Sequence, residues 1–339
     1  MSGMSPTHPK NIETRLSHLR RLTQPFLSWG LGLLVIALLG YYLYRNREKL
    51  AQATAAPPGI FFILTGLIVG TMLARAWQLR LMLGSMGTHI PIRRALTLTL
   101  SSQVLNCLPL RPGTLAQAVA LKKENSFKYA TYAALFLGQI LVIFLGAGIL
   151  GIVALLASGR LLAPESRLIL TMLATGIAVP LLVFHIPRAF TVARRTWVQR
   201  ALGDFFAGLR RLRDNRAQFA IVLAVTLIKL FLTALRLRVA AIPFGIDVTF
   251  VSCVVLACIT QVSFLVSFTP GGVGIRQFLT ASVALVVGLR FDDGLLLSSL
   301  DHAVAIILTF ALGVPAVLQL LRGKRSKEAI LLNGQASNV

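Results

Sequence analysis

Two arginines lie beside proline–glycine breaks in apolar stretches of this chain. Arg111 lies in the segment LNCLPLRPG, residues 105–113, and Arg276 ends the segment FLVSFTPGGVGIR, residues 264–276. A guanidinium binds phosphate oxygens through two parallel hydrogen bonds. A helix that restarts after a break also directs free N–H groups and a partial positive charge back at it. The two breaks therefore predict an anion site, for which a phosphate is the best ligand.

The residues of the breaks are types that interrupt a helix. Proline lacks an N–H donor and disfavours helical backbone in the residue before it, whereas glycine permits tight turns. Such a break survives in a bilayer only when it is buried in protein or lines a water-filled cavity, and paired breaks in a transporter-like chain point to the binding site. The alternative for each break is a kink or a loop end at the membrane surface. The predicted helix breaks are Pro109, Pro112 and Pro270, and the predicted headgroup-binding residues besides the two arginines are Gly113, Gly271, Gly272 and Gly274.

Three further ionisable residues lie within apolar stretches: Asp301, His302 and Lys229. Charges at membrane depth are costly and usually face an interior or a partner. Asp301 could pair with Arg276 or Arg111, or carry a proton that couples transport. The alternative is a polar cap near the membrane surface, formed by Ser298 to His302. Lys229 has a stem long enough to reach an aqueous cavity.

Four arginines near the ends of apolar runs are expected to extend toward the membrane surface. Arg236 and Arg238 lie close enough to a predicted helix end for their guanidiniums to snorkel. Arg75 and Arg80 are expected either to snorkel or to bind lipid headgroups.

The composition is that of an integral membrane protein. Of the 339 residues, 56% are hydrophobic and only 13% charged, and the mean hydropathy is +0.77. A soluble globule of this size cannot hide so much apolar surface. The net charge of +23 comes from lysines and arginines that lie mostly in short segments between apolar runs. This placement suits a membrane surface and argues against nucleic-acid binding.

The chain lacks a recognisable set of catalytic residues. Few of its 11 acidic residues lie near an apolar run, and it contains neither an HExxH motif nor a grouped Ser/His/Asp set. The cysteines Cys107, Cys253 and Cys258 are odd in number and have no CxxC spacing, so we expect no disulfide and no metal site. We therefore predict no catalysis and no cofactor. The open alternatives are a membrane-embedded lipid-modifying enzyme and a non-transporting scaffold for lipid or envelope synthesis.

Apolar runs of about 20 residues predict an all-α integral membrane protein with about eight transmembrane helices. Re-entrant or broken segments are expected near residues 95–113 and 264–276. The predicted organisation is a basic cytoplasmic leader (1–25), a polytopic transmembrane domain (26–321) and a cytoplasmic tail (322–339). The predicted spans are Phe26–Tyr44, Ile60–Met82, Tyr129–Ala157, Leu168–His185, Phe219–Ile242, Phe250–Phe268, Gln277–Leu289 and Leu295–Leu321, with a short broken segment at Ala95–Pro112.

Basic residues in short loops predict the orientation. The loop 186–217 carries eight arginines and the tail is also basic, which places both on the cytoplasmic side of the inner membrane. An even number of spans then puts both termini in the cytoplasm. Within the loop, apolar residues recur at three- and four-residue spacing, which predicts an amphipathic helix on the membrane surface; the alternative is a solvated linker. These apolar residues are Val198, Leu202, Phe205, Leu209 and Leu212.

The second break, TPGGVGIR at residues 269–276, resembles the PGGxGxRE signature of the flippase-like membrane region of lysylphosphatidylglycerol synthases and their stand-alone relatives. The segment RAWQLR at residues 75–80 is similar to the Arg/Trp-rich second span of that family. The resemblance implies eight spans with re-entrant segments and a role in moving or handling lipids. The first break resembles the N-x-x-P-x-R-x-G element of the family at Asn106, Pro109, Arg111 and Gly113.

Three positions depart from the family pattern: Thr114, Gln117 and Gln277 replace an acidic residue, an arginine and a glutamate. The loss of two carboxylates favours an anionic ligand. The chain also ends soon after its last span, so we do not expect the soluble aminoacyl-transfer domain or lysine transfer. We predict that the protein binds an anionic phospholipid or polyprenyl-type lipid headgroup and helps it cross the bilayer by alternating exposure. Lipid-synthesis enzymes are candidate partners.

Overall fold

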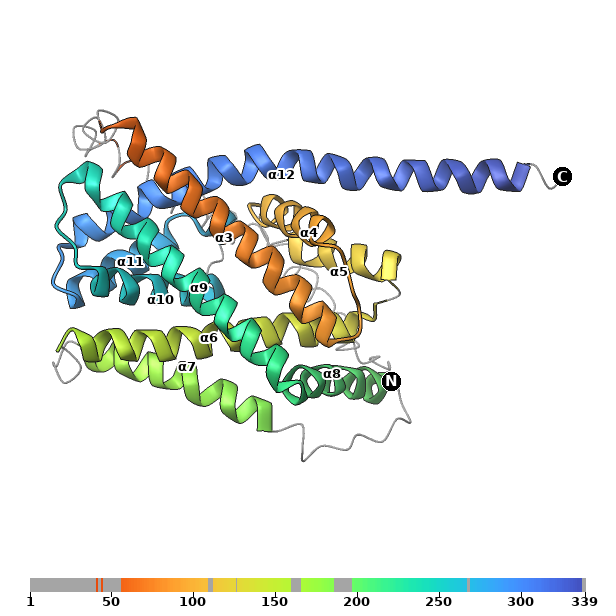
Figure 1. Ribbon diagram of the computed structural model, residues 1–339, viewed down its shortest axis with the longest axis horizontal. Coiled ribbons are helices and arrows are strands. Elements are labelled where there is room, and N and C mark those ends of the chain that lie inside the picture. Colours follow the sequence, from red (N-terminus) through yellow and green to blue (C-terminus); the bar gives the residue numbers. More distant parts are fainter. Residues whose placement is uncertain are drawn as a thin grey trace, which may run out of the picture.

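The computed structural model describes residues 41, 44, 56–108, 112–125, 127–159, 166–185, 197–266 and 269–336, and these residues form helices without any strand (Figure 1). The helices are α3 (Pro58–Ser85), α4 (Ile92–Leu105), α5 (Pro112–Asn125), α6 (Tyr129–Ala157), α7 (Arg167–His185), α8 (Trp197–Asp214), α9 (Arg216–Ala241), α10 (Phe250–Val266), α11 (Ile275–Val286) and α12 (Phe291–Ala336). Two 3₁₀ turns, η3 (Ile242–Phe244) and η4 (Pro270–Gly272), follow α9 and α10.

Five helices in the described residues are long and apolar enough to cross a membrane, so this is a multi-pass membrane protein. They match five of the eight predicted spans. The predicted first span, Phe26–Tyr44, lies outside the described residues except for Tyr41 and Tyr44. The five membrane segments are Pro58–Ser85, Tyr129–Ala157, Arg167–Phe184, Arg216–Phe244 and Phe291–Leu320.

The two remaining predicted spans are shorter helices. The helices α10 and α11 have 17 and 12 residues, and α4 and α5 have 14 each. At about 1.5 Å per residue, α4, α5 and α11 are much shorter than a hydrocarbon core about 30 Å thick, and α10 is slightly shorter. The two separate spans at Phe250–Phe268 and Gln277–Leu289 stay a prediction, because neither is among the five long membrane helices. The helices α10 and α11 flank the second break and α4 and α5 flank the first, and each pair forms one broken element.

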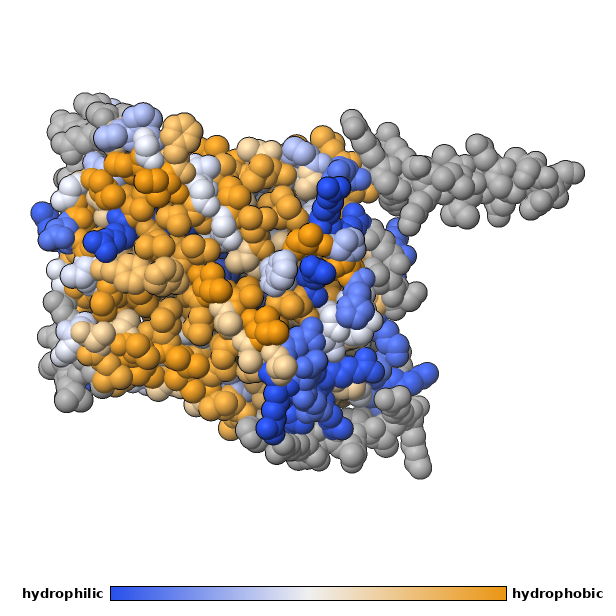
Figure 2. All heavy atoms as spheres, viewed as in Figure 1, coloured by the Kyte–Doolittle hydropathy of each residue, from blue (hydrophilic) through white to orange (hydrophobic). Residues whose placement is uncertain are grey.

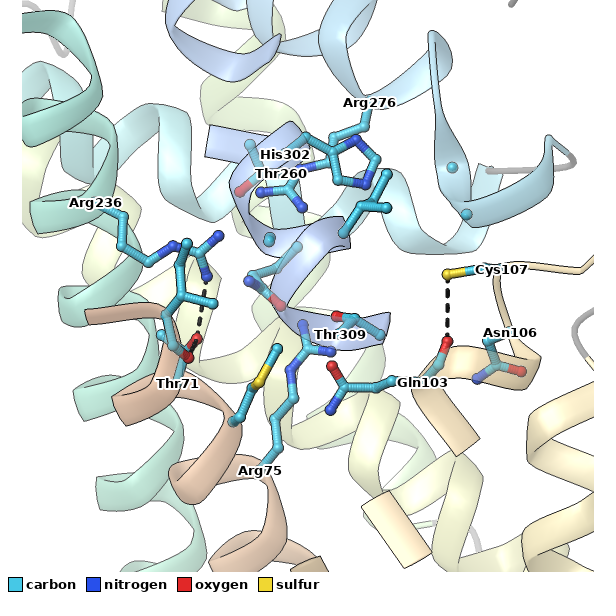
Figure 3. A pocket seen from close by; sticks show the side chains of 17 residues that line it. Thr71, Arg75, Gln103, Asn106, Cys107, Arg236, Thr260, Arg276, His302 and Thr309 are labelled. Carbon is cyan, nitrogen blue, oxygen red and sulfur yellow. Dashed lines mark hydrogen bonds between the residues drawn. The ribbon is translucent and has the colours of Figure 1, made fainter. Parts of the chain in front are cut away.

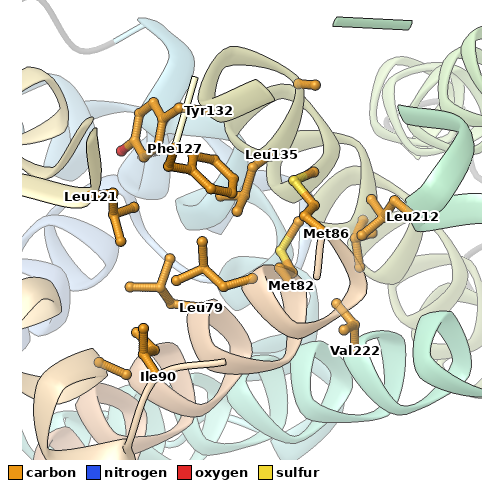
Figure 4. Close-up of a cluster of buried hydrophobic side chains, with 14 of the residues drawn as sticks. Leu79, Met82, Met86, Ile90, Leu121, Phe127, Tyr132, Leu135, Leu212 and Val222 are labelled. Carbon is orange, nitrogen blue, oxygen red and sulfur yellow. The ribbon is translucent and has the colours of Figure 1, made fainter. Parts of the chain in front are cut away.

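These two broken elements belong to opposite ends of the molecule. One apolar cluster joins α4 and α5 to the C-terminal end of α3 and the N-terminal end of α6, and contains Leu98, Leu121, Met82 and Leu135 (Figure 4). A second cluster joins α10 and α11 to the C-terminal ends of α6 and α9. Because α6 runs between the clusters, the two broken elements enter the helix bundle from opposite ends and meet inside it.

Small residues on α6 allow its neighbours to approach closely, as is common in membrane helix packing. A Cβ added at Gly138 would lie 2.6 Å from a methyl group of Leu212 on α8. A Cβ added at Gly151 would lie 2.7 Å from a methyl group of Leu173 on α7. Close packing against α6 therefore depends on these glycines, because a larger side chain would push α7 and α8 away.

The amphipathic helix predicted in the basic loop is present as α8. Its residues Leu209 and Leu212 are only 1% exposed and pack in the cluster around α6, whereas Leu202 is 44% exposed. An ion pair of 2.9 Å joins Asp204 of α8 to Lys128 just before α6. The helix thus docks on the bundle and is not a solvated linker. Figure 2 shows hydrophilic side chains gathered at this end of the molecule, beside an apolar flank.

Candidate functional site

The second break has the backbone that its glycines predict. The φ angles of Gly271, Gly272 and Gly274 are 63°, 74° and 85°, a left-handed region that other residues rarely adopt. The chain then starts α11 at Ile275, with Gly274 as the N-cap residue. Arg276 consequently lies in the first turn of a helix whose N-terminus faces the break.

The first break is described only on its two sides. The helix α4 ends at Leu105, and α5 begins at Pro112, which occupies the first helical position. Pro109 and Arg111 lie outside the described residues, so their predicted roles stay predictions. Gly113 was predicted to form a tight turn, and this is corrected because it lies within α5.

Gly113 instead allows two helices to touch. A Cβ at this position would overlap the carbonyl oxygen of Ser102 and would lie 2.7 Å from Oδ1 of Asn106. The same Oδ1 accepts a hydrogen bond of 3.2 Å from the backbone N–H of Thr114. The start of α5 is thereby held against the end of α4.

The two breaks meet at a cavity of about 170 Å³ inside the bundle (Figure 3). Asn106 and Cys107 of the first break line it, as do Gly271 and Gly272 of the second. A Cβ at Gly271 would lie 3.8 Å from Sγ of Cys107, so the two breaks are in contact. Of the predicted headgroup-binding residues, Arg276, Gly271 and Gly272 line the cavity, whereas Gly113 and Gly274 do not.

Asp301 is the acidic centre of this site. It is completely buried and accepts two hydrogen bonds from Arg236, of 2.8 Å from Nε and 2.9 Å from Nη2. Arg276 donates a third bond, of 3.0 Å from its Nη2. The ion pair with Arg276 is one of the two considered from the sequence. Asp301 has no exposed surface, which favours the buried ion pair over a solvent-facing polar cap.

Two arginines of the site were not predicted as part of it. Arg236 was expected to snorkel, but it is 6% exposed, and its Nη1 also donates to Oγ1 of Thr71 at 3.1 Å. Arg75 likewise points into the cavity from α3 (Figure 3). By contrast, Arg80 is exposed and lies 5.5 Å from the ring centre of Trp77, which suits a residue at headgroup level.

A polar stripe in the sequence could have revealed both arginines. On α9, polar residues recur every three or four positions and all are buried, and on α3 such a stripe contains Arg75. Polar residues repeated on one face of a membrane helix point to the bundle interior. Snorkelling was inferred from distance to the helix end alone, without regard to the face. The α9 stripe is Thr226, Lys229, Thr233 and Arg236, and the α3 stripe is Thr71, Arg75 and Gln78.

Gln277 connects the second break to His302. Its Oε1 accepts the backbone N–H of Gly274 at 2.7 Å, so its Nε2 is the atom that faces Nδ1 of His302 at 2.9 Å. An amide nitrogen can only donate. Nδ1 of His302 is therefore the acceptor, and the ring is neutral with its proton on Nε2. A glutamate at position 277 would instead require a proton on Nδ1.

Lys229 was predicted to reach an aqueous cavity, but it does not line this one. It is 2% exposed, and its Nζ has a single acceptor, Oε1 of Gln78, at 3.4 Å. Gln78 in turn donates to Thr226 at 2.9 Å. None of the ion pairs among the described residues involves Lys229. A buried amine with one long hydrogen bond lowers stability relative to an apolar chain of similar shape.

Replacing Lys229 with methionine is therefore expected to stabilise the protein by about 1–3 kcal/mol. The measurement is the midpoint of thermal unfolding in detergent. Lys229→Ala is the matched variant, and it should destabilise because it leaves a cavity. A loss of stability in Lys229→Met that Lys229→Arg restores would show that a positive charge is needed here.

The fold and the site together define a multi-pass membrane protein with a cavity inside its bundle, lined by arginines where two broken helical elements meet. The family model described as "Lysylphosphatidylglycerol synthase TM region" matches residues 29–313 of the chain. The chain belongs to this family, as its break motifs predict. It is thereby placed among membrane proteins involved in lipid handling. A search of curated proteins finds no match to the chain.

Proposed function

We propose that the protein binds an anionic lipid headgroup in the cavity between its two breaks and helps that lipid cross the bilayer. One observation carries the proposal: Arg75, Arg236 and Arg276 converge on a cavity within the membrane domain, and among the described residues the carboxylate that pairs with them is that of Asp301 alone. A buried excess of positive charge is unfavourable unless a counter-charge enters. An anionic headgroup supplies that counter-charge.

Several hydrogen-bond donors at the cavity have no acceptor among the described residues. Nε of Arg276 and Nε2 of Gln103 are buried and have no hydrogen-bond partner among the described residues. None of the ion pairs in that part of the chain involves Arg75. Unsatisfied donors cost more in a low-dielectric interior than in water. Phosphate oxygens accept from several donors at once, so such a ligand would satisfy this set.

Alternating exposure of the cavity is the proposed mechanism. The α4–α5 element enters the bundle from one end and α10–α11 from the other, and both contribute residues to the cavity. A small displacement of one element would open the site toward its own side while the other stays closed. Broken elements suit such movement because few backbone hydrogen bonds cross the break. The proton-carrier role considered for Asp301, His302 or Lys229 stays a prediction.

The proposed location is the inner membrane, with both termini in the cytoplasm. Its support is the gathering of basic residues: α8 and the C-terminal end of α12 lie toward the same end of the molecule (Figure 1). Lysines and arginines mark the cytoplasmic side of bacterial-type membrane proteins. We also propose that the protein is not an enzyme, because transport requires binding and release only.

The test is translocation of candidate lipids in liposomes that contain the purified protein. Arg75→Gln should slow translocation about tenfold or more, because a charge-assisted hydrogen bond to the headgroup is lost. Arg276→Gln should act in the same direction, and Arg111→Gln tests the arginine outside the described residues. Arg80→Gln, on the exposed face of the same helix as Arg75, is the control and should keep the wild-type rate.

Three outcomes of this experiment would argue against the proposal. Equal rates in wild type, Arg75→Gln and Arg276→Gln would remove the arginines from the mechanism. A new lipid product detected by mass spectrometry would favour a lipid-modifying enzyme. A folded protein that neither translocates nor binds any tested lipid would favour a scaffold for lipid-synthesis enzymes.

A further inference from the structure

The charges at the cavity specify more than the sign of the ligand. Three guanidiniums line the cavity, and among the described residues the carboxylate paired with them is that of Asp301, behind the lining, which leaves an excess of two positive charges. His302, which also lines the cavity, adds no charge because its Nδ1 accepts a hydrogen bond. A ligand with two negative charges would therefore neutralise the site.

The carboxylate of Asp301 has no oxygen left for a cationic ligand. Both oxygens of Asp301 are occupied by Arg236 and Arg276. Oγ1 of Thr71 accepts from Arg236 and donates to the carbonyl oxygen of Ile68 at 2.7 Å. An ammonium group placed here would meet arginines and no unpaired carboxylate. These contacts disfavour binding of a lipid that presents an aminoacyl cation to the site.

We infer that the cavity binds a doubly charged phosphate headgroup, namely a phosphate monoester or diphosphate at the end of a lipid, in preference to a singly charged phosphodiester. This inference rests on the proposed function and names its substrate class. A phosphate monoester carries a charge of about −1.5 to −2 at neutral pH. Its three terminal oxygens can accept from Arg75 and from Nε of Arg276 at the same time.

A second cavity, an apolar groove, provides a binding position for the hydrocarbon chain of this ligand. A groove of about 430 Å³ runs between α4 and α12, lined mostly by apolar residues that include Leu96, Leu100 and Leu312. Leu100 and Leu312 lie one helical turn from Gln103 and Thr309, which line the cavity. The groove therefore lies on the same two helices as part of the charged site, about one helical turn away. A hydrocarbon chain in it makes the ligand a lipid and not free phosphate.

The experiment compares phosphatidic acid with phosphatidylglycerol carrying the same acyl chains. Each is added to the purified full-length protein in detergent, and affinity is taken from the concentration dependence of the unfolding midpoint. At pH 8 phosphatidic acid should bind about tenfold more tightly, because it makes an additional charge-assisted contact. At pH 5, below the second pKa of about 6, the monoester loses one charge and the preference should shrink toward unity.

The ionisable groups that face the ligand determine how the pH effect is interpreted. These groups are Arg75, Arg236, Arg276, Asp301 and His302, and phosphatidylglycerol binding measured at both pH values reports any change that arises in them and not in the ligand. The described parts of α4 and α10 contribute only uncharged residues to the lining. Arg75→Gln should reduce phosphatidic acid binding about tenfold at pH 8, whereas Arg80→Gln should not.

Each alternative result has a distinct meaning. Equal binding of both lipids at pH 8, with both weakened in Arg75→Gln, would overturn the double charge and leave the proposed function standing. Binding of neither lipid would overturn the proposed function as well. Inorganic phosphate that binds as tightly as phosphatidic acid would show that the site takes free phosphate and that the groove holds no chain.

Discussion

Replacing Asp301 with alanine is expected to lower the free energy of unfolding by about 3–5 kcal/mol, a large part of the stability of a typical domain. The substitution would leave Arg236 and the partly buried Arg276 facing each other without a carboxylate. Their side chains are 7% and 19% exposed, so water would screen the repulsion only partially. The wild-type carboxylate accepts three hydrogen bonds from these two arginines, and alanine replaces none of them.

The measurement is the unfolding midpoint of the purified variant in detergent, together with its yield from the membrane. Asp293→Asn is the matched control: it removes a carboxylate from the first turn of the same helix, away from the cavity, and should change the midpoint little. If Asp301→Ala does not fold, Arg236→Met combined with Asp301→Ala should restore folding in part, because it removes one uncompensated charge. If Asp301→Ala alone is as stable as wild type, the buried ion-pair network does not stabilise the protein and the prediction is wrong.

Replacing Gly113 with valine is expected to destabilise the protein by about 3 kcal/mol and to weaken ligand binding. The new side chain would overlap the carbonyl oxygen of Ser102, and backbone atoms cannot move aside as a flexible side chain can. The ends of α4 and α5 would separate, and Asn106 would lose its bond to the backbone of Thr114. Since Asn106 lines the cavity, the damage should reach the site.

The matched control is the same substitution at Gly66 of α3, where no atom lies within 4 Å of an added Cβ. Both glycines are helical, so the difference between the two variants isolates the close approach from helix propensity. Unfolding midpoints and lipid binding are measured for both. If the two variants have similar unfolding midpoints and similar lipid affinities, the contact between α4 and α5 contributes neither to stability nor to binding.

The broken elements could be predicted because proline and glycine act locally. The positive φ angles at Gly271, Gly272 and Gly274 and the start of α11 beside Arg276 follow from residue types within a few positions. The length of apolar runs likewise predicts the five long membrane helices. The role of Gly113 could not be predicted in this way, because its contact with Ser102 depends on how two helices pack.

The arginines show where prediction from spacing failed. Arg236 lies near the end of α9, where a long side chain can reach the surface, whereas Arg75 lies well inside α3; both lie on the face that packs inward. Which way such a side chain turns depends on the position of its partner. For Arg236 that partner is Asp301, 65 residues away in the sequence.

The sequence by itself determined that this is a membrane protein, that its helices break at two places and that arginine accompanies each break, since these follow from composition and local backbone chemistry. Only the tertiary structure decided that the breaks meet from opposite ends at one cavity. It also decided that Asp301 is shared by Arg236 and Arg276 while Arg75 is left to face the cavity. The physical reason is that charge balance within a membrane depends on distances between helices, which no local pattern of residues specifies.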